Sequence, residues 1–259
     1  MPAADLELLI EAALAAGEVS RGFAGGTARI WEKADNAGPV TEADLAVNER
    51  LAGILRPARP DYGWLSEESP DSAERLAAER VFIIDPIDGT RSFIDGATTW
   101  AHAIAVAERG VVTAAVIHLP MRDELFAAAA GQGATLNGAP IAPSDRDQLE
   151  GAAVLAARPA LEPKHWNGEV PKIRREYRPS LAYRLASVAE GRFDAMITLR
   201  RTWEWDVAAG DLILREAGAT VTDRTGNALR FNNPHPAVDG VLAGGAKVHA
   251  GLLAALTRS

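Results

Sequence analysis

The sequence of 259 residues predicts an α+β fold in which a layered sheet is flanked by helices. Short apolar runs rich in branched residues recur between residues 63 and 141, separated by turn residues, and are typical of strands. Amphipathic patterns at helical spacing precede them, over 5–23, and return in the second half of the chain. Because the strands follow one another without a helix between each pair, regular βαβ alternation is not expected.

Composition is that of a soluble globular protein and limits the partners. Charged residues make up 24% and hydrophobic residues 47%, and the length allows one large domain or two small ones. The net charge of −8 and the lack of Lys/Arg runs argue against a nucleic-acid polymer as partner. The chain has no cysteine, which excludes disulfides and thiolate metal sites and fits the cytoplasm. No basic leader and no run of roughly 18 apolar residues is found, so no membrane insertion is expected.

The first part of the chain predicts two helices and a short strand. The pattern over 5–23 indicates a helix that Gly25-Gly26 ends, and residues 28–33 favour a strand. Thr41 is predicted to cap a second helix, with Asp44 completing a capping box. Asp44 can therefore be a helix cap or a functional carboxylate, and the local sequence leaves both open.

Strands dominate the middle of the chain. A short strand at 63–66 ends in Glu67-Glu68, which can form a solvated loop or converge with Asp85 on one cation. The apolar run 81–84 predicts a buried strand that ends at Asp85, because Pro86 cannot donate a ladder hydrogen bond. The polar stretch 143–150 predicts a domain boundary. Further strands are predicted at 100–107 and 111–118, which form a hairpin, and at 125–130 and 134–141.

The last part combines strands and helices around an excursion of undefined shape at 159–179. Ser180 is predicted to start a helix that stops at Gly191, and a helix beginning beside Asp206 ends at Gly218. Asp206 can offset the dipole of that helix or serve a functional site. Strands are predicted at 152–157, 193–199, 219–223 and 238–243, and a closing helix at 248–256.

The stretch Asp85-Pro-Ile-Asp88-Gly89-Thr90 carries the strongest functional signal. Carboxylates at the end of a buried strand are costly to bury unless a cation neutralises them, and a divalent cation would do so. The N–H groups of Gly89 and Thr90, at the start of a short helix, suit an anion such as phosphate. Metal beside phosphate is the arrangement of metal-assisted phosphoryl transfer. The same residue types form surface turns, so the motif alone leaves that alternative open.

Three motifs taken together resemble the inositol monophosphatase family, which comprises magnesium-dependent, lithium-sensitive phosphatases. They are Glu67-Glu68, Asp85 to Thr90, and Trp205-Asp206-Val-Ala-Ala-Gly210, and they occur in family order over nearly the whole chain. The resemblance implies a layered αβαβα sandwich of two sub-domains. The first, 1–145, would carry most metal ligands, and the second, 146–259, would contribute Asp206 and substrate contacts. A small phosphorylated substrate and a homodimer are also implied, since many members are dimers.

The resemblance further implies roles for single residues. Asp88, Gly89 and Thr90 would bind phosphate. Asp44, Glu67 and Thr90 would be catalytic, because Glu67 and Thr90 orient a metal-activated water that attacks phosphorus and Asp44 pairs with the threonine. The implied ligands of two or three Mg²⁺ ions are Glu67, Asp85, the carbonyl oxygen of Ile87, Asp88 and Asp206.

The segment 180–191 and the Glu204-Trp205-Asp206 triplet look like the bacterial 3′(2′),5′-bisphosphate nucleotidase branch. That branch removes the 3′-phosphate of adenosine 3′,5′-bisphosphate. Arg91, Ser180, Arg184 and Glu204 are accordingly expected to contact substrate, although Arg91 can also be a solvated residue. Inositol-1-phosphate phosphatase ranks second and histidinol phosphatase third. A metal-binding scaffold without activity is the non-enzymatic alternative.

Overall fold

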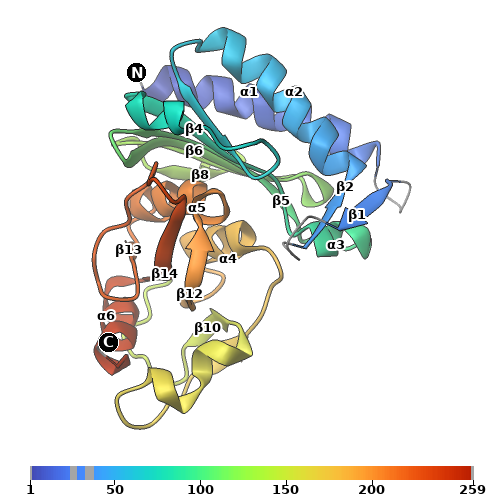
Figure 1. Ribbon diagram of the computed structural model, residues 1–259. Helices are drawn as coiled ribbons and strands as arrows, with labels where there is room; N and C mark the ends of the chain where they lie inside the picture. The colour runs from blue at the N-terminus through green and yellow to red at the C-terminus, as the bar shows by residue number, and fades with distance from the viewer. Residues whose placement is uncertain (1, 24–27, 33–37, 258–259) are drawn as a thin grey trace.

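The structure is a computed structural model that describes residues 2–23, 28–32 and 38–257. The helix end predicted at Gly25-Gly26, and Lys33 at the end of the predicted strand 28–33, lie outside these residues. Figure 1 shows a helix pair, a large sheet, a second helix pair, a smaller sheet and a last helix stacked in layers. This arrangement confirms the predicted α+β class and its αβαβα layering. No helix in the described ranges is long and apolar enough to cross a bilayer.

The larger sheet has seven strands in the order β3-β4-β5-β6-β7-β8-β9, so each strand pairs with its neighbours in sequence. β3 and β4 are parallel, and the other neighbours are antiparallel. The predicted hairpin is confirmed, with Arg109 and Gly110 at positive φ between β5 and β6. The strands are β3 (Gly63–Ser66), β4 (Arg80–Asp88), β5 (Ala101–Glu108), β6 (Val111–Leu119), β7 (Glu124–Ala129), β8 (Ala134–Leu136) and β9 (Ala139–Pro140).

β4 runs past its predicted end at Asp85. It continues to Asp88, which lies opposite Ala101, with an irregularity in the pairing between Asp85 and Asp88. Pro86 falls in this irregular stretch, where the ladder requires no donor from its nitrogen. Both carboxylates are therefore carried by a paired strand rather than by a free loop.

The smaller sheet has five strands in the order β11-β10-β12-β14-β13. β12 is longer than the predicted strand 193–199 and ends at Trp203, because Arg201, Thr202 and Trp203 pair with β14 beyond a register shift. This extension leads the chain directly into α5. The strands are β10 (Ala153–Ala156), β11 (Arg174–Glu176), β12 (Ala195–Trp203), β13 (Thr220–Thr222) and β14 (Ala237–Gly244).

Helices cover both faces of the larger sheet and the outer face of the smaller one. α1 and α2 bury Leu9 and Leu51 against Phe82 of β4 and its neighbours. α4 and α5 lie between the sheets, and α6 packs on the smaller sheet through Leu252. Burial of each such leucine contributes on the order of 2 kcal/mol to folding. The helices are α1 (Pro2–Arg21), α2 (Glu42–Ala58), α3 (Thr90–Ile94), α4 (Leu181–Ala189), α5 (Glu204–Glu216) and α6 (Ala246–Ala255).

The strands of the larger sheet come from residues 63–140, and those of the smaller sheet from 153–244. We propose that 1–145 and 146–259 are two sub-domains. A separate short hairpin of β1 (Ile30–Glu32) and β2 (Pro39–Thr41) lies beside α3 (Figure 1).

Candidate active site

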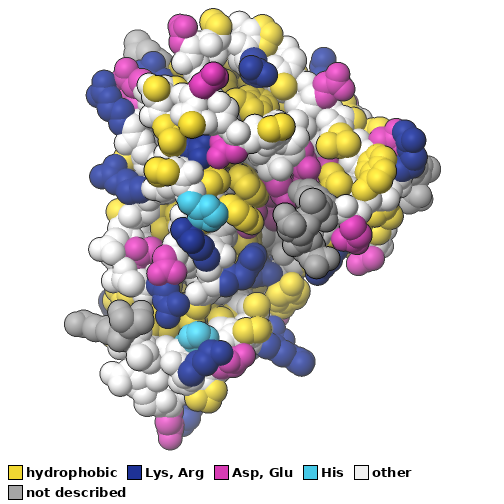
Figure 2. Space-filling view, in the orientation of Figure 1, with side chains coloured by type: hydrophobic (Ala, Val, Ile, Leu, Met, Phe, Trp, Pro, Cys, Tyr) yellow, Lys and Arg dark blue, Asp and Glu magenta, His cyan; other side chains and the backbone are white. Residues whose placement is uncertain are grey.

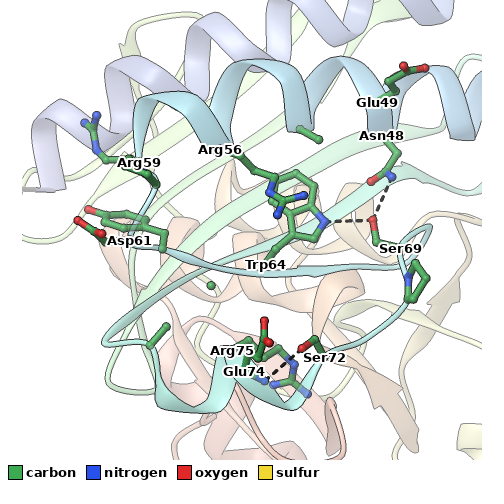
Figure 3. A pocket seen from close by; sticks show the side chains of 16 residues that line it. Asn48, Glu49, Arg56, Arg59, Asp61, Trp64, Ser69, Ser72, Glu74 and Arg75 are labelled. Atoms are coloured by element: carbon green, nitrogen blue, oxygen red, sulfur yellow. Dashed lines mark hydrogen bonds between the residues drawn. The ribbon is translucent and has the colours of Figure 1, made fainter.

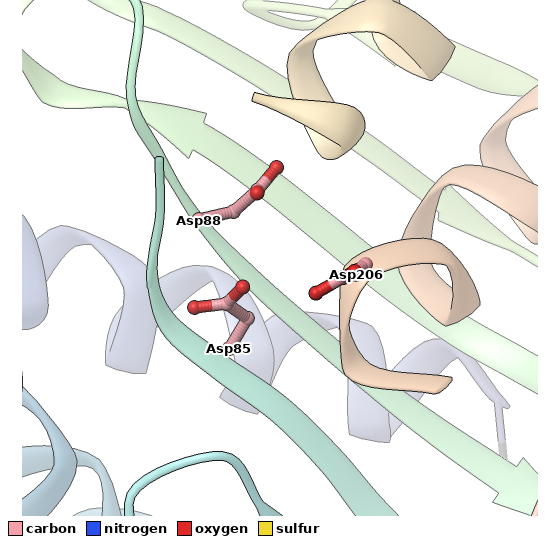
Figure 4. A group of neighbouring side chains, drawn as sticks. All are labelled: Asp85, Asp88 and Asp206. Carbon is pink, nitrogen blue, oxygen red and sulfur yellow. The ribbon is translucent and has the colours of Figure 1, made fainter. Parts of the chain in front are cut away.

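Three carboxylates from distant parts of the chain meet where β4 ends and α5 begins. One oxygen from each of Asp85, Asp88 and Asp206 lies within 4.8 Å of the other two. Figure 4 shows Asp85 and Asp88 extending from β4 and Asp206 from the first turn of α5 toward a common space. The structure thus brings together three of the ligands that the resemblance implies.

Asp85 is the most deeply buried member of the cluster, with 1% of its surface exposed. Its Oδ1 atom is buried without a hydrogen-bond partner. Burial, followed by the negative charges of Glu67, Asp88 and Asp206, raises the pKa of Asp85 well above its ordinary value. An ionised carboxylate in these surroundings is strongly unfavourable unless a positive charge is bound beside it.

The donor set fits a hard divalent cation. Mg²⁺ prefers oxygen ligands, and the three aspartates supply carboxylate oxygens from a strand and a helix end. Among the residues that the structure describes, no sulfur or imidazole ligand joins them. A cation there would also satisfy the orphaned oxygen of Asp85. The acidic cluster therefore has the chemistry of a metal site.

Asp88 is held in place from the opposite layer. Its Oδ2 atom accepts hydrogen bonds from the Ser180 hydroxyl and from the Ala182 N–H, both at 2.5 Å, at the N-terminus of α4. Burial raises the pKa of Asp88 to about 6, although these hydrogen bonds oppose the rise. Because both bonds go to Oδ2, the Oδ1 atom remains for a cation.

Asp44 caps α2 and also contacts Thr90. Its Oδ2 atom accepts from the Thr41 N–H at 2.8 Å and from the Thr41 hydroxyl at 2.6 Å, which closes the predicted capping box of α2. Its Oδ1 atom lies 3.2 Å from Thr90 Oγ1. Burial raises the pKa of Asp44, and the hydrogen bonds from Thr41 oppose this effect. The helix cap therefore orients the carboxylate that contacts Thr90.

An open cavity of about 330 Å³ surrounds the carboxylates. Glu67 lines it, and the Glu67 N–H bonds to Ile84 O at 3.1 Å, which fixes the end of β3 beside β4. Gly89 also lines it in a left-handed conformation, φ 97°, where a side chain would meet Ser180 and Trp100 at about 3.4–3.5 Å. The remaining motif residues on the cavity wall are Ile87, Thr90 and Arg91.

Of the four expected substrate contacts, only Arg91 lines this cavity. Ser180 is fully buried beneath Asp88, and Arg184 lines an adjoining cavity. Glu204 is fully buried and accepts hydrogen bonds from Asn232 and Asn233 instead. The prediction that Ser180 and Glu204 contact substrate has no support in this geometry.

Three residues that the sequence did not single out stand at the cavity mouth, namely Tyr177, Arg200 and Trp203. Tyr177 and Trp203 are 48% and 41% exposed, and Trp203 stacks on Trp205 at 4.9 Å between ring centroids. Tyr177 lies in the excursion whose shape the sequence did not define. In Figure 2, acidic side chains are visible in a recess, with Lys and Arg side chains below it.

The adjoining cavity, of about 370 Å³, shares Tyr177, Pro179, Leu181 and Arg200 with the first. His165 and Arg184 also line it, and its lining includes no Asp or Glu. The Arg184 guanidinium lies 4.6 Å from the Tyr177 ring centroid, and its Nε donates to the carbonyl of Arg178. The two cavities therefore adjoin across these four residues, with the carboxylates lining the first and Arg184 lining the second.

A larger open cavity of about 980 Å³ lies elsewhere, between α2 and the loop that follows β3 (Figure 3). Arg56 stands over Trp64 there, with its guanidinium 6.0 Å from the ring centroid, and Arg75 lies on the opposite side. None of the three clustered aspartates lines it, so we assign it no part in the chemistry.

Comparison with known proteins agrees with this geometry. The family model described as "Inositol monophosphatase family" matches residues 3–259. The Nus factor SuhB of Pseudomonas aeruginosa is 36% identical over 229 residues, which cover 83% of this chain and 81% of that protein. The inositol-1-monophosphatase of Mesorhizobium japonicum is 32% identical over 270 aligned residues, covering 98% and 96% of the two chains.

Solved structures give the same result. The extragenic suppressor protein SuhB of Bartonella henselae superposes with a TM-score of 0.80 at 31% identity, and 97% of each chain is covered. The inositol monophosphatase of Anabaena superposes with a TM-score of 0.79 at 30% identity, and 97% of this chain and 94% of that chain are covered. The chain therefore belongs to the inositol monophosphatase family, whose members are metal-dependent phosphatases that hydrolyse phosphomonoesters.

Proposed function

We propose that the protein is a Mg²⁺-dependent phosphomonoesterase, and the convergence of Asp85, Asp88 and Asp206 is the observation that carries this proposal. Glu67 and the carbonyl of Ile87 would complete the ligand set for two or three ions. Bound there, Mg²⁺ would supply positive charge to the phosphoryl oxygens and lower the pKa of the attacking water.

The remaining motif residues handle the phosphate and the proton. Thr90 Oγ1 has two acceptors nearby, Asp44 Oδ1 at 3.2 Å and Ile87 O at 3.3 Å. With its proton donated to one of them, the hydroxyl oxygen would keep lone pairs that can accept a hydrogen bond from water. Glu67 would orient that water from the other side, and the N–H groups of Gly89 and Thr90 would bind phosphate oxygens.

The arginines that line the two adjoining cavities favour a substrate with a second negative group. Arg91, Arg184 and Arg200 make no ion pair with a carboxylate among the residues that the structure describes. Tyr177 and Trp203 add aromatic surface at the mouth. A second phosphate and a nucleobase match these groups, so we propose that the substrate is a 3′,5′-bisphosphate nucleotide such as adenosine 3′,5′-bisphosphate.

Inositol 1-phosphate is the second candidate, because relatives in Rhizobium meliloti and Mesorhizobium japonicum carry the name inositol-1-monophosphatase. Histidinol phosphate is the third. We also propose a cytoplasmic location, which the absence of cysteine supports. The homodimer implied by the family resemblance stays a prediction.

A side-by-side assay of phosphate release with Mg²⁺ decides between these substrates. We expect kcat/KM for adenosine 3′,5′-bisphosphate to exceed that for inositol 1-phosphate and histidinol phosphate by at least about tenfold, since one extra charge-assisted contact is worth about 1.5–3 kcal/mol. If the nucleotide is the poorest of the three, the nucleotidase proposal is wrong while the phosphatase assignment stands.

Arg200→Met tests the contact with the second phosphate. We expect kcat/KM for adenosine 3′,5′-bisphosphate to fall about 10–100-fold, and kcat/KM for adenosine 3′-monophosphate to stay within about threefold, because only the first substrate carries the group that the guanidinium would bind. Arg201→Met is the matched control, since Arg201 is exposed, lies opposite Asp239 of β14 in the strand pairing and does not line the cavity. An equal loss with both substrates would contradict this contact.

A further inference from the structure

A buried polar network joins the start of α5 to the edge of the larger sheet. It consists of Arg75, Glu204, Asn232 and Asn233, here called the α5 anchor. Arg75 lies in the short 3₁₀ helix Ala73–Ala77, which packs against β3, and Glu204 is the first residue of α5. Arg75 is 3% exposed and Glu204 is fully buried.

On the α5 side, the Glu204 carboxylate is fully engaged. Its Oε2 atom accepts from the Asn232 N–H at 2.7 Å. Its Oε1 atom accepts from the Asn233 N–H at 2.9 Å and from Asn233 Nδ2 at 2.7 Å. The Glu204 N–H also donates to Pro236 O at 3.0 Å. Four hydrogen bonds therefore fix the first residue of the helix to the segment 232–236.

On the side of the larger sheet, Arg75 donates hydrogen bonds to Asn232 and Asn233, the residues that also bind Glu204. Its Nη1 donates to Asn232 Oδ1 at 2.7 Å and its Nη2 to Asn233 O at 3.0 Å. Asn232 Nδ2 returns a hydrogen bond to Arg75 O at 3.0 Å, and Asp71 holds the guanidinium through two further bonds. The segment 232–233 is thus held between Arg75 and Glu204.

The anchor connects the two pieces of backbone that carry the clustered carboxylates. β3, beside Arg75, is the parallel neighbour of β4, which carries Asp85 and Asp88. Glu204 stands two residues before Asp206. Residues two apart on a helix point about 200° apart, so Glu204 faces away from the cluster when Asp206 faces into it. The anchor therefore links the backbone on both sides of the cluster, and none of its residues lines the cavity around the carboxylates.

We propose that Glu204 and Arg75 are positioning residues that hold Asp206 at ligating distance from Asp85 and Asp88. Buried ionic groups rarely improve stability over apolar residues of similar size, so their presence here points to a positional role. The inference rests on the metal site of the proposed function, and supporting contacts of this kind typically change metal affinity about 10–100-fold.

Glu204→Gln and Arg75→Met test the inference, with Mn²⁺ as the probe because its binding is read by electron paramagnetic resonance without any turnover. We expect the dissociation constant for Mn²⁺ to rise about tenfold or more in both variants. At saturating Mg²⁺, kcat is expected to stay within about threefold of wild type, because occupation of the site restores the ligand geometry. Asn233→Ala, which removes one donor to Glu204, replaces either variant that fails to fold. We expect it to raise the dissociation constant for Mn²⁺ by a smaller factor.

Asp211→Asn is the matched control. Asp211 is a buried carboxylate on the same helix that pairs with Arg215 at 3.0 Å and does not hold the first turn. Asp211→Asn is expected to leave Mn²⁺ affinity unchanged. If the folded anchor variants bind Mn²⁺ as tightly as wild type, or if Asp211→Asn loses as much Mn²⁺ affinity as they do, the positioning role is wrong and the metal site still stands. A wild-type protein that binds no Mn²⁺ would overturn the metal site as well.

Discussion

Asp85→Asn is expected to reduce phosphate release at saturating Mg²⁺ by at least about a thousandfold, because charge stabilisation by a bound metal is worth several kcal/mol in the transition state. Asp85 is the centre of the cluster, and its Oδ1 atom has no other partner. The amide offers one neutral oxygen in place of a carboxylate. The measurement is kcat for the best of the candidate substrates, with circular dichroism to show that the variant is folded.

The same variant should be at least as stable as wild type when metal is absent. Burial and neighbouring charges raise the pKa of Asp85, so its ionised form destabilises the metal-free fold near neutral pH. Asp5→Asn is the control, since Asp5 is buried on α1, is bound by Arg59 at 2.9 Å and lies outside the cluster. That variant should lose stability and keep its turnover. Retained hydrolysis in folded Asp85→Asn would refute the role of Asp85 as a metal ligand, whereas a wild-type protein that releases no phosphate with Mg²⁺ would favour the scaffold alternative.

Removal of metal is expected to destabilise the protein strongly at pH 7.5 and weakly at pH 5. Asp44, Asp85 and Asp88 have raised pKa values in the fold, about 6 for Asp88. The stability that such carboxyl groups contribute is fully present below their pKa in the unfolded chain, about 4. It is lost as the pH rises through their pKa in the folded protein. The shift of Asp88 from 3.8 to about 6 alone corresponds to about 3 kcal/mol at pH 7.5.

A divalent cation bound to the cluster would neutralise it and restore that free energy. The expected fall in melting temperature on adding a chelator is on the order of 6–12 °C at pH 7.5 and less than half of that at pH 5. Scanning calorimetry with and without chelator at both pH values measures it. An equal effect at both pH values, or none at pH 7.5, would show that the carboxylates are not the groups the metal stabilises.

Local patterns in the sequence predict the elements and one strand end of the site, whereas the layering and the convergence of Asp206 come from the family resemblance. Asp85, Asp88, Gly89 and Thr90 lie within six consecutive residues, so one strand end and one short helix start place them close together. The capping box at Thr41 and Asp44 is likewise a short-range feature and is found as predicted. Strand and helix ends shifted where pairing partners intervened, as at Trp203, which pairs with Ala237 of β14.

The substrate side could not be predicted in the same way, because it depends on which way each side chain points. Glu204 and Asp206 are close in sequence and lie on opposite faces of α5, so the resemblance of the triplet said nothing about the position of Glu204. Ser180 caps α4, and its hydroxyl donates a hydrogen bond to Asp88. Tyr177 and Arg200 reach the cavity from an irregular segment and from an extended strand, and no local pattern marks either one.

Anomalous diffraction from crystals soaked in Mn²⁺ tests the metal centre most directly. We expect at least one strong peak within about 2.0–2.6 Å of carboxylate oxygens of Asp85, Asp88 and Asp206, the range that hard divalent cations adopt with oxygen ligands. Peaks confined to other parts of the surface, with these aspartates bare at millimolar Mn²⁺, would contradict the active site described here.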